Sequence, residues 1–121
     1  MGDGDSTNRQ IRIGEVFSGS NRTGGGTIEA NGSGALVFTN SVFNEAEVGT
    51  WVGARTLTLA GSSTGGNEIQ GSIVDNNDTT TDISVSIVKD GTGQWTLSGI
   101  STYTGTTEVN DGTLIVDGSL S

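Results

Sequence analysis

The sequence predicts an all-β chain wound as a parallel β-helix, a solenoid of about five coils. Short β-branched apolar runs are separated by Gly, Asn or Asp, and parts of the chain repeat. Hydrophobic residues make up 31% of the chain, Gly contributes 21 residues and Pro is absent. That apolar share is small for a globular sandwich of two sheets, which is the alternative. It suffices for a solenoid, whose core is one narrow column of side chains.

Self-similarity is the more informative observation. Three pairs of strings match, at offsets of about 38 to 41 along the chain: 56–61 with 94–99, 64–69 with 104–109, and 71–74 with 112–115. A looser copy relates 29–37 to 108–115. Apolar runs recur at a spacing of about 16 to 23, at Ile13, Leu36, Leu57, Ile73, Trp95 and Leu114. This spacing predicts one coil per run and a repeat that spans two coils.

Each coil is expected to contain three short strands that pair in register with those of the coils above and below. Parallel strands are therefore predicted throughout 55–117, with Leu97 and Leu114 fully buried inside the coil. The outward residues Thr56, Thr58, Thr96 and Ser98 are expected to be exposed, because alternate side chains point to opposite faces. Glycines are expected to supply positive φ at corners, at positions 61, 99, 105, 112 and 118.

Charge and composition exclude several functions. The net charge is −9 and the sequence pI is about 4.1, which excludes a nucleic-acid footprint and attraction to anionic membranes. There is no Cys and no His, so thiol chemistry and the usual metal ligand and general base are absent. The acidity is interpreted as keeping a β-rich surface soluble, with cation binding as the alternative.

A specific motif lies at 89–116, reading KDGTGQWTLSGISTYTGTTEVNDGTLIV. It resembles the autotransporter-associated β-strand repeat, also called the passenger-associated transport repeat. The residues that fit its pattern are Lys89, Gly91, Gly93, Trp95, Leu97, Gly99, Tyr103, Gly105, Thr107, Val109, Gly112, Leu114 and Val116. Ser101 replaces the usual Asn. The segment 55–88 resembles the part that commonly precedes this repeat.

This resemblance implies a right-handed parallel β-helix in a segment of a bacterial autotransporter-type passenger. Such a chain is secreted or lies on the bacterial cell surface, outside the outer membrane. The repeat is associated with passenger secretion rather than with one activity. We expect a flexible tail at 1–9 and a repeat domain at 10–121. The N-terminus has no basic and apolar regions of a signal peptide, and the chain is interpreted as an excised internal fragment.

Three constellations could carry chemistry. Glu29, Glu68 and Glu108 recur at similar places and could stack on one face, where a glycosidase needs two carboxylates about 5–9 Å apart. Regular recurrence is also what a repeat produces, so no catalytic residue is assigned and an enzyme is not expected. Asp75, Asp78 and Asp82 lie in a run of oxygen ligands suited to Ca²⁺, the only cofactor considered. A solvated turn is the alternative.

Aromatic residues could form a platform for carbohydrate. Trp51, Trp95 and Tyr103 are the candidates, but Trp95 occupies an inward Leu position of the repeat and is expected in the core. Trp51 lies in the least repetitive region and is the best candidate for an exposed aromatic.

Three functions remain in view: a structural stalk that aids folding and secretion, an adhesin for carbohydrate or a surface protein, and a fibre subunit. The strand at 114–116 is expected to end an unfinished coil with unpaired backbone groups. The alternating residues 10–17 could dock there, giving head-to-tail association. Tails that fold back over the ends are the alternative.

Overall fold

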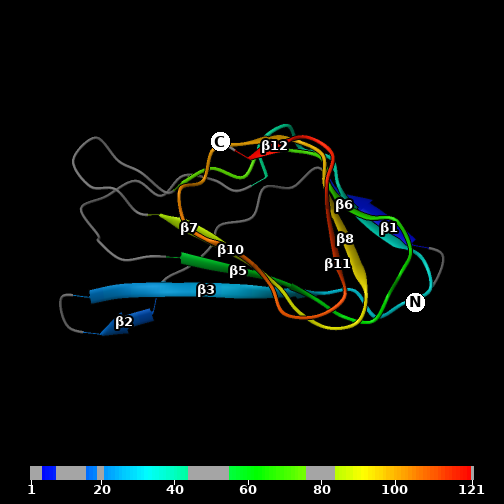
Figure 1. Cartoon of the computed structure of the whole chain (residues 1–121), viewed down its shortest axis with the longest axis horizontal. Helices are drawn as coiled ribbons and strands as arrows, with labels where there is room; N and C mark the ends of the chain where they lie inside the picture. Colours follow the sequence, from blue (N-terminus) through cyan, green and yellow to red (C-terminus); the bar gives the residue numbers. More distant parts are fainter. Residues whose placement is uncertain (1–3, 8–15, 19–20, 44–54, 76–83, 121) are drawn as a thin grey trace.

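The structure is a computed structural model, in which we describe residues 4–7, 16–18, 21–43, 55–75 and 84–120 (Figure 1). The described elements are all β-strands, in agreement with the predicted fold class. Twelve strands form two five-stranded sheets and one two-stranded sheet in this part of the chain. Every pairing is parallel except that of β2 with β3.

Each of the three sheets is built from strands that lie far apart in the sequence; the strands follow in spatial order. Sheet one contains β1 (Gly4–Thr7), β4 (Ala35–Phe38), β6 (Asn67–Ile69), β8 (Gln94–Leu97) and β11 (Thr113–Val116). Sheet two contains β10 (Thr107–Val109), β7 (Val85–Lys89), β5 (Arg55–Ala60), β3 (Asn21–Glu29) and β2 (Val16–Ser18). Sheet three contains β12 (Ser119–Leu120) and β9 (Ile100–Ser101).

The chain visits the sheets in a repeating order. It runs from sheet two into sheet one and then toward sheet three before it returns to sheet two (Figure 1). In the two earlier rounds, an isolated parallel bridge between Val42 and Ser72 takes the place that sheet three has in the later rounds. We call the four rounds segment I (24–43), segment II (55–75), segment III (84–103) and segment IV (107–120). Their parallel stacking is consistent with a β-helix and confirms the parallel strands predicted for 55–117 where these residues are described.

The spacing between stacked strands differs from the predicted one. In sheet two, Gly24 lies opposite Arg55 and Arg55 opposite Val85, whereas Ile87 lies opposite Thr107. The number of residues between two stacked positions is thus about one and a half times as large at the first two steps as at the third. Sheet one shows the same shortening at its last step, from β8 to β11. The predicted spacing of the coils thus holds only between segments III and IV.

The predicted repeat of two coils is also wrong. It rests on the similar strings at 56–61 and 94–99, which would have to occupy equivalent places in the solenoid. In the structure the first string forms β5 of sheet two and the second contains β8 of sheet one. The similarity therefore reflects a shared alternation of apolar and small polar residues and not a shared position in the coil.

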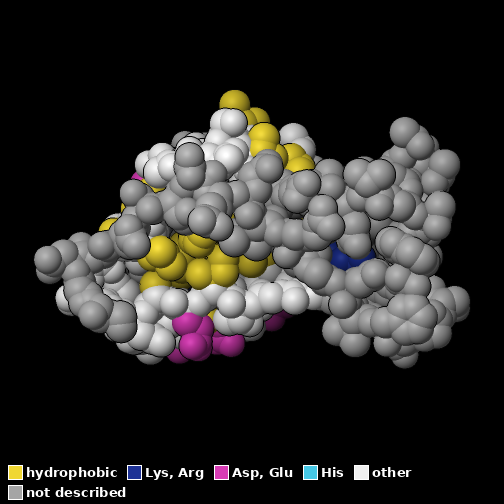
Figure 2. All heavy atoms as spheres, turned by 180° about the vertical axis from the view of Figure 1, so that it is seen from behind, with side chains coloured by type: hydrophobic (Ala, Val, Ile, Leu, Met, Phe, Trp, Pro, Cys, Tyr) yellow, Lys and Arg dark blue, Asp and Glu magenta, His cyan; other side chains and the backbone are white. Residues whose placement is uncertain are grey.

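The apolar core follows the alternation of the strands. Buried and half-buried residues alternate along β5, β7 and β8. The buried apolar side chains form one cluster: Ala30, Phe38, Phe43, Leu57, Leu59, Ile69, Ile73, Val85, Ile87, Trp95, Leu97 and Tyr103. Phe38 and Phe43 meet edge to face with their ring centroids 5.1 Å apart. Figure 2 shows hydrophobic side chains in the middle of the opposite face and acidic ones along its lower edge.

Outward residues are less exposed than predicted. Thr56, Thr58, Thr96 and Ser98 are half-buried. The reason is the stacking of the strands: Thr56 lies opposite Ser86 and Thr58 opposite Val88, so each side chain is partly covered by its neighbour. The small side chains of these outward positions keep this covering compact.

The N-terminal part of the chain also contains paired strands. β1 lies inside residues 1–9, for which the sequence predicts a flexible tail, and it pairs in parallel with β4, Gly4 opposite Ala35. β2 pairs with the first residues of β3 in the antiparallel sense. The predicted domain boundaries themselves stay a prediction.

Candidate functional site

The non-glycine motif residues that precede segment IV lie on the inside of the coil. Lys89 is 0% exposed and Trp95 and Leu97 are each 1% exposed, while Tyr103 is also buried. Leu97 is thus fully buried, as predicted. Leu114 is only half-buried, contrary to the prediction, because β11 is the edge strand of sheet one and has no strand over its outer side in the described residues.

Glycine serves two different purposes at the corners. Gly61, Gly91 and Gly112 have positive φ, which confirms the prediction at 61 and 112. The prediction is wrong at 99, 105 and 118, since no positive φ occurs there. At Gly99 the reason for glycine is close approach, because a Cβ would overlap the carbonyl group of Gly71 in the segment below.

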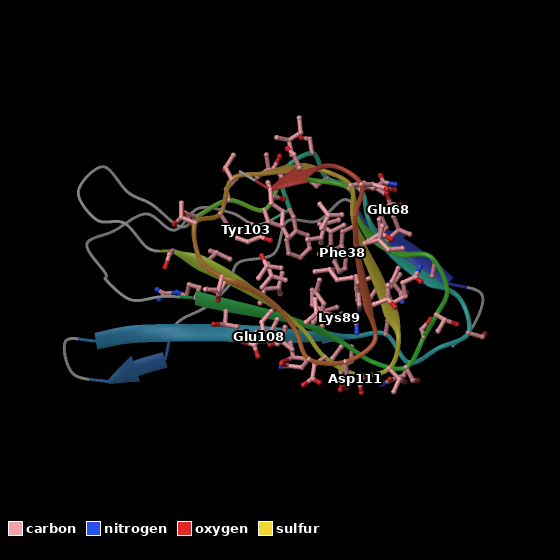
Figure 3. All side chains as sticks on the ribbon, in the orientation of Figure 1. Phe38, Glu68, Lys89, Tyr103, Glu108 and Asp111 are labelled. Atoms are coloured by element: carbon pink, nitrogen blue, oxygen red, sulfur yellow. The ribbon has the colours of Figure 1, made fainter. Side chains whose placement is uncertain are left out.

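Lys89 places a charged group in the interior (Figure 3). Its Nζ donates hydrogen bonds to the carbonyl oxygens of Asp90 (2.6 Å), Gly91 (2.9 Å) and Asp111 (3.3 Å). Burial lowers the pKa of the ammonium group, and the nearby carboxylates of Asp111 and Asp90 act in the opposite direction. The sequence assigns Lys89 to the motif but gives no sign that it is buried.

The aromatic platform is not formed by the residues that are described. Trp95 lies in the core and its Nε1 donates to the carbonyl oxygen of Ala60 at 3.1 Å. The buried Tyr103 bonds through its hydroxyl with Thr107 Oγ1 at 2.7 Å. Neither ring face is free for a sugar, so the core position expected for Trp95 is confirmed and the platform built on these two residues is wrong. Trp51 lies outside the described residues.

A buried amide joins three segments, and sequence reasoning missed it. Asn67 is 1% exposed. Its Oδ1 accepts from the backbone N of Leu36 at 2.9 Å, while its Nδ2 donates to the carbonyl oxygens of Gln94 at 3.0 Å and Ser63 at 3.2 Å. Asn67 lies opposite Trp95 in sheet one. An amide at an inward position of an apolar column was the available signal.

The carboxylate of Asp75 is already used by the fold. Its Oδ1 accepts from the backbone N of Val85 at 2.8 Å and of Thr104 at 3.0 Å, and its Oδ2 accepts from Thr104 Oγ1 at 2.6 Å. Asp78 and Asp82, the other candidate ligands for Ca²⁺, lie outside the described residues. Within the described ranges no group of three or more His, Cys, Asp or Glu could hold a metal ion.

The three recurring glutamates do not converge. Glu68 lies in β6 of sheet one, whereas Glu29 and Glu108 lie in sheet two, in segments I and IV. Figure 3 shows Glu68 and Glu108 on different outer sides of the coiled chain. Glu68 instead accepts a hydrogen bond of 2.6 Å from Ser98 Oγ in the next segment. The stacking of these carboxylates on one face is therefore wrong.

The surface offers a shallow hollow and an apolar end. The hollow lies at the corner between sheets two and one, and its lining includes Glu29, Asn31 and Asp90 but no aromatic residue. The end is formed by the edge strands β10, β11 and β12. The exposed large apolar residues of the described chain lie there or beside it: Ile100, Val109, Val116 and Leu120.

Residues 87–116 match the passenger-associated-transport-repeat family. This chain therefore contains a repeat of autotransporter passengers, and the matched range includes the whole motif at 89–116 that the sequence analysis describes. Over 114 residues the chain is 42% identical to the Adhesin BmaC autotransporter of Brucella suis biovar 1 (strain 1330), and the match covers 94% of this chain and 3% of that protein. No solved structure matches the chain.

These findings identify the chain as a segment of an autotransporter-type passenger, which is secreted or lies at the cell surface. The chain spans about 3% of the length of the relative that it matches. Among the described residues there is no helix of the length and apolar character needed to cross a membrane.

Proposed function

We propose that this chain is a structural stalk segment of a surface passenger, wound as a right-handed parallel β-helix of about five coils. Segments I to IV are four of these coils and β1 belongs to another. The observation that carries the proposal is the unbroken parallel stacking from segment I to segment IV, in which each strand obtains its backbone partners from neighbouring segments. Such a rod lengthens by adding coils and holds other parts of a protein away from the surface.

The stalk has no catalytic role in this proposal. Of the carboxylates that a glycosidase would need, Glu68 lies in sheet one, and Glu29 and Glu108 lie in sheet two with two strands between them. The buried polar groups of Lys89 and Asn67 and the half-buried carboxylate of Asp75 are hydrogen-bonded to backbone atoms of neighbouring segments, so they hold the coils together.

The stalk also aids folding and secretion of the passenger, because stacked coils stabilise one another. The test uses the full-length parent protein with Leu97→Asp, which places a carboxylate in the core, and Thr96→Asp on the outer face of the same strand as the control. Surface display is measured by protease accessibility on intact cells. Leu97→Asp should lower display several-fold while Thr96→Asp keeps it. Equal display of both variants would contradict the secretion role.

An adhesive role is the second candidate, and it is favoured by the name of the similar Brucella protein, an adhesin. The ligand would be a carbohydrate or a surface protein. Because Trp95 and Tyr103 are buried, stacking on their rings cannot supply the contact. Binding of the chain to immobilised glycans and to host-cell monolayers tests this role. Binding that Trp51→Ala leaves unchanged would show that Trp51 does not contact the ligand.

Self-association through the open end is a further part of the proposal. In the part of the chain that the structure describes, β10, β11 and β12 present unpaired strand edges together with exposed Val109 and Val116, and such edges take up strands of another chain. Sedimentation velocity at rising concentration should show growing assemblies for the wild type and a monomer for Val116→Asp. A wild-type monomer at every concentration would remove the fibre.

Ca²⁺ remains the one cofactor in the proposal, bound by Asp75, Asp78 and Asp82. Calorimetric titration with CaCl₂ alone tests it, with Asp78→Asn as the variant and MgCl₂ as the control ion. A heat of Ca²⁺ binding that is measured for the wild type and is lost in Asp78→Asn supports the site. No heat, or equal heat in both chains, contradicts it.

A further inference from the structure

Lys89 is the only lysine of the chain, and its side chain lies where its stacked neighbours are apolar. In sheet two it is opposite Leu59 of segment II on one side and Val109 of segment IV on the other. A buried ammonium costs several kcal/mol unless it is hydrogen-bonded. The fold therefore has to provide acceptors at this place in the column.

The three hydrogen-bond acceptors come from two different segments. Two belong to the corner of segment III, at Asp90 and Gly91, and they are the shorter contacts, 2.6 and 2.9 Å. The third is the carbonyl oxygen of Asp111, 3.3 Å away in the corner of segment IV. An ammonium group has three N–H donors. All three donors are therefore matched only when segment IV is docked.

The corner of segment IV lies unusually close to segment III beside this ammonium group. Gly112 has a φ of +68°, and a Cβ there would overlap the carbonyl oxygens of Gly93 and Gly91 and lie 2.7 Å from Lys89 Nζ. Any side chain at 112 would therefore lift the corner of segment IV off segment III, and the carbonyl group of the adjacent Asp111 would move with it. Glycine at 112 thus allows the approach that brings this acceptor to Lys89.

Among the described residues, segment IV has only segment III to fix its register. Its strands β10, β11 and β12 contain three, four and two residues, and its side chains are mostly exposed apart from the half-buried Leu114 and Ile115. In a strand with one weakly buried face, a slip by one residue costs little. A slip would move the Asp111 carbonyl group away from Lys89.

We propose that Lys89 locks segment IV in register on segment III, and that its ammonium group becomes accessible only when segment IV opens. The lock is specific to this step of the solenoid, since the stacked position in segment II is Leu59. The inference does not depend on whether the passenger acts as a stalk or an adhesin.

The first test uses the unmodified chain. The rate at which N-hydroxysuccinimidyl acetate acetylates Lys89 is measured by mass spectrometry of the peptide that contains Lys89. Native-state hydrogen exchange is measured under the same conditions for comparison. The amides of Asn110 and Thr113 bond to Lys89 and Gly93 and report on segment IV, while those of Gln94 and Ser98 bond to Ser63 and Ile69 and report on segment III. Lys89 should show the protection factor of Asn110 and Thr113. Protection equal to that of Gln94 and Ser98, or none, would overturn the proposal.

The second test uses variants. Lys89→Leu introduces the residue that segment II carries at the stacked position, and Val88→Thr on the outer face of β7 is the control. Lys89→Leu should speed exchange at Asn110 and Thr113 by about tenfold or more, the factor expected for losing a hydrogen bond to a charged group. Exchange at Gln94 should change less than about threefold, as in local opening. Unchanged exchange in segment IV, or the same acceleration in both segments, would overturn the lock.

Discussion

Segments III and IV have the same three strands in the same order, and their residues pair one to one, yet they differ in burial. Leu97 lies opposite Val116, and the exposed fractions of the two side chains are 1% and 41%. Lys89 lies opposite Val109, with exposed fractions of 0% and 51%. Segment III is covered on both sides, whereas segment IV has a neighbour on one side among the described residues. Burial of a coil is therefore supplied by its neighbours more than by its own residues.

The same comparison applies to the backbone. Segment III exchanges hydrogen bonds with segments on both sides, for example from Ser98 to Ile69 and from Asp117 to Leu97. In the part of the chain that the structure describes, segment IV pairs with segment III only. Substitutions can therefore compare positions that have a neighbouring segment on both sides with positions that have one on a single side.

Leu97→Ala and Leu114→Ala should give the largest contrast. Truncating the fully buried Leu97 should lower the free energy of unfolding by about 3 kcal/mol. Leu114 is half-buried, so its truncation should cost about 1 kcal/mol, in proportion to the area that it removes from water. Urea denaturation followed by circular dichroism measures both. Equal losses would show that the end of the coil is covered in solution.

Asn67→Ala and Asn110→Ala compare a buried amide with an exposed one. Removal of the Asn67 amide leaves the backbone N of Leu36 and the carbonyl oxygen of Gln94 without this partner, at a cost of about 2 kcal/mol. Asn110 is exposed, and its replacement should change stability by less than about 0.5 kcal/mol. The same denaturation experiment decides, and a neutral Asn67→Ala would show that these groups find other partners.

Tyr103 connects segment III to segment IV, and its replacement should give the smallest of the three contrasts in stability. Tyr103→Phe removes the hydrogen bond with Thr107 and should cost about 1 kcal/mol near neutral pH. Burial raises the pKa of the Tyr103 hydroxyl, and the bond to Thr107 partly opposes this. The unfolded chain then loses this proton first, near pH 10, so stability falls as pH rises through the folded pKa.

The measurement is the Tm of wild type and Tyr103→Phe between pH 9 and 11. Because Lys89 has a lowered pKa, it acts in the opposite direction below about pH 10.5, and its contribution cancels in the comparison of the two chains. The stability advantage of the wild type should shrink with rising pH. A constant difference would mean that Tyr103 titrates alike in both states.

Part of the interior was predictable from the sequence. The repeat placed Trp95 and Leu97 inside, and the structure confirms this. The steps between coils were not predictable, because the strings Thr-Leu-Thr-Leu and Trp-Thr-Leu-Ser look alike although β5 and β8 lie in different sheets. The contacts of Asn67 and Asp75 join residues that lie far apart in the sequence, so their partners could not be identified from the sequence alone.

The sequence by itself determined that the chain forms short strands with apolar residues on one side, since apolar periodicity and turn residues are local properties. Which strand stacks on which was decided only by the tertiary structure. The period of two is the same in every strand, and backbone hydrogen bonds form between any two strands whatever their side chains. The depth of burial at Leu114 and the coordination of the Lys89 ammonium group also belong to the tertiary structure. Both depend on whether another segment lies above them.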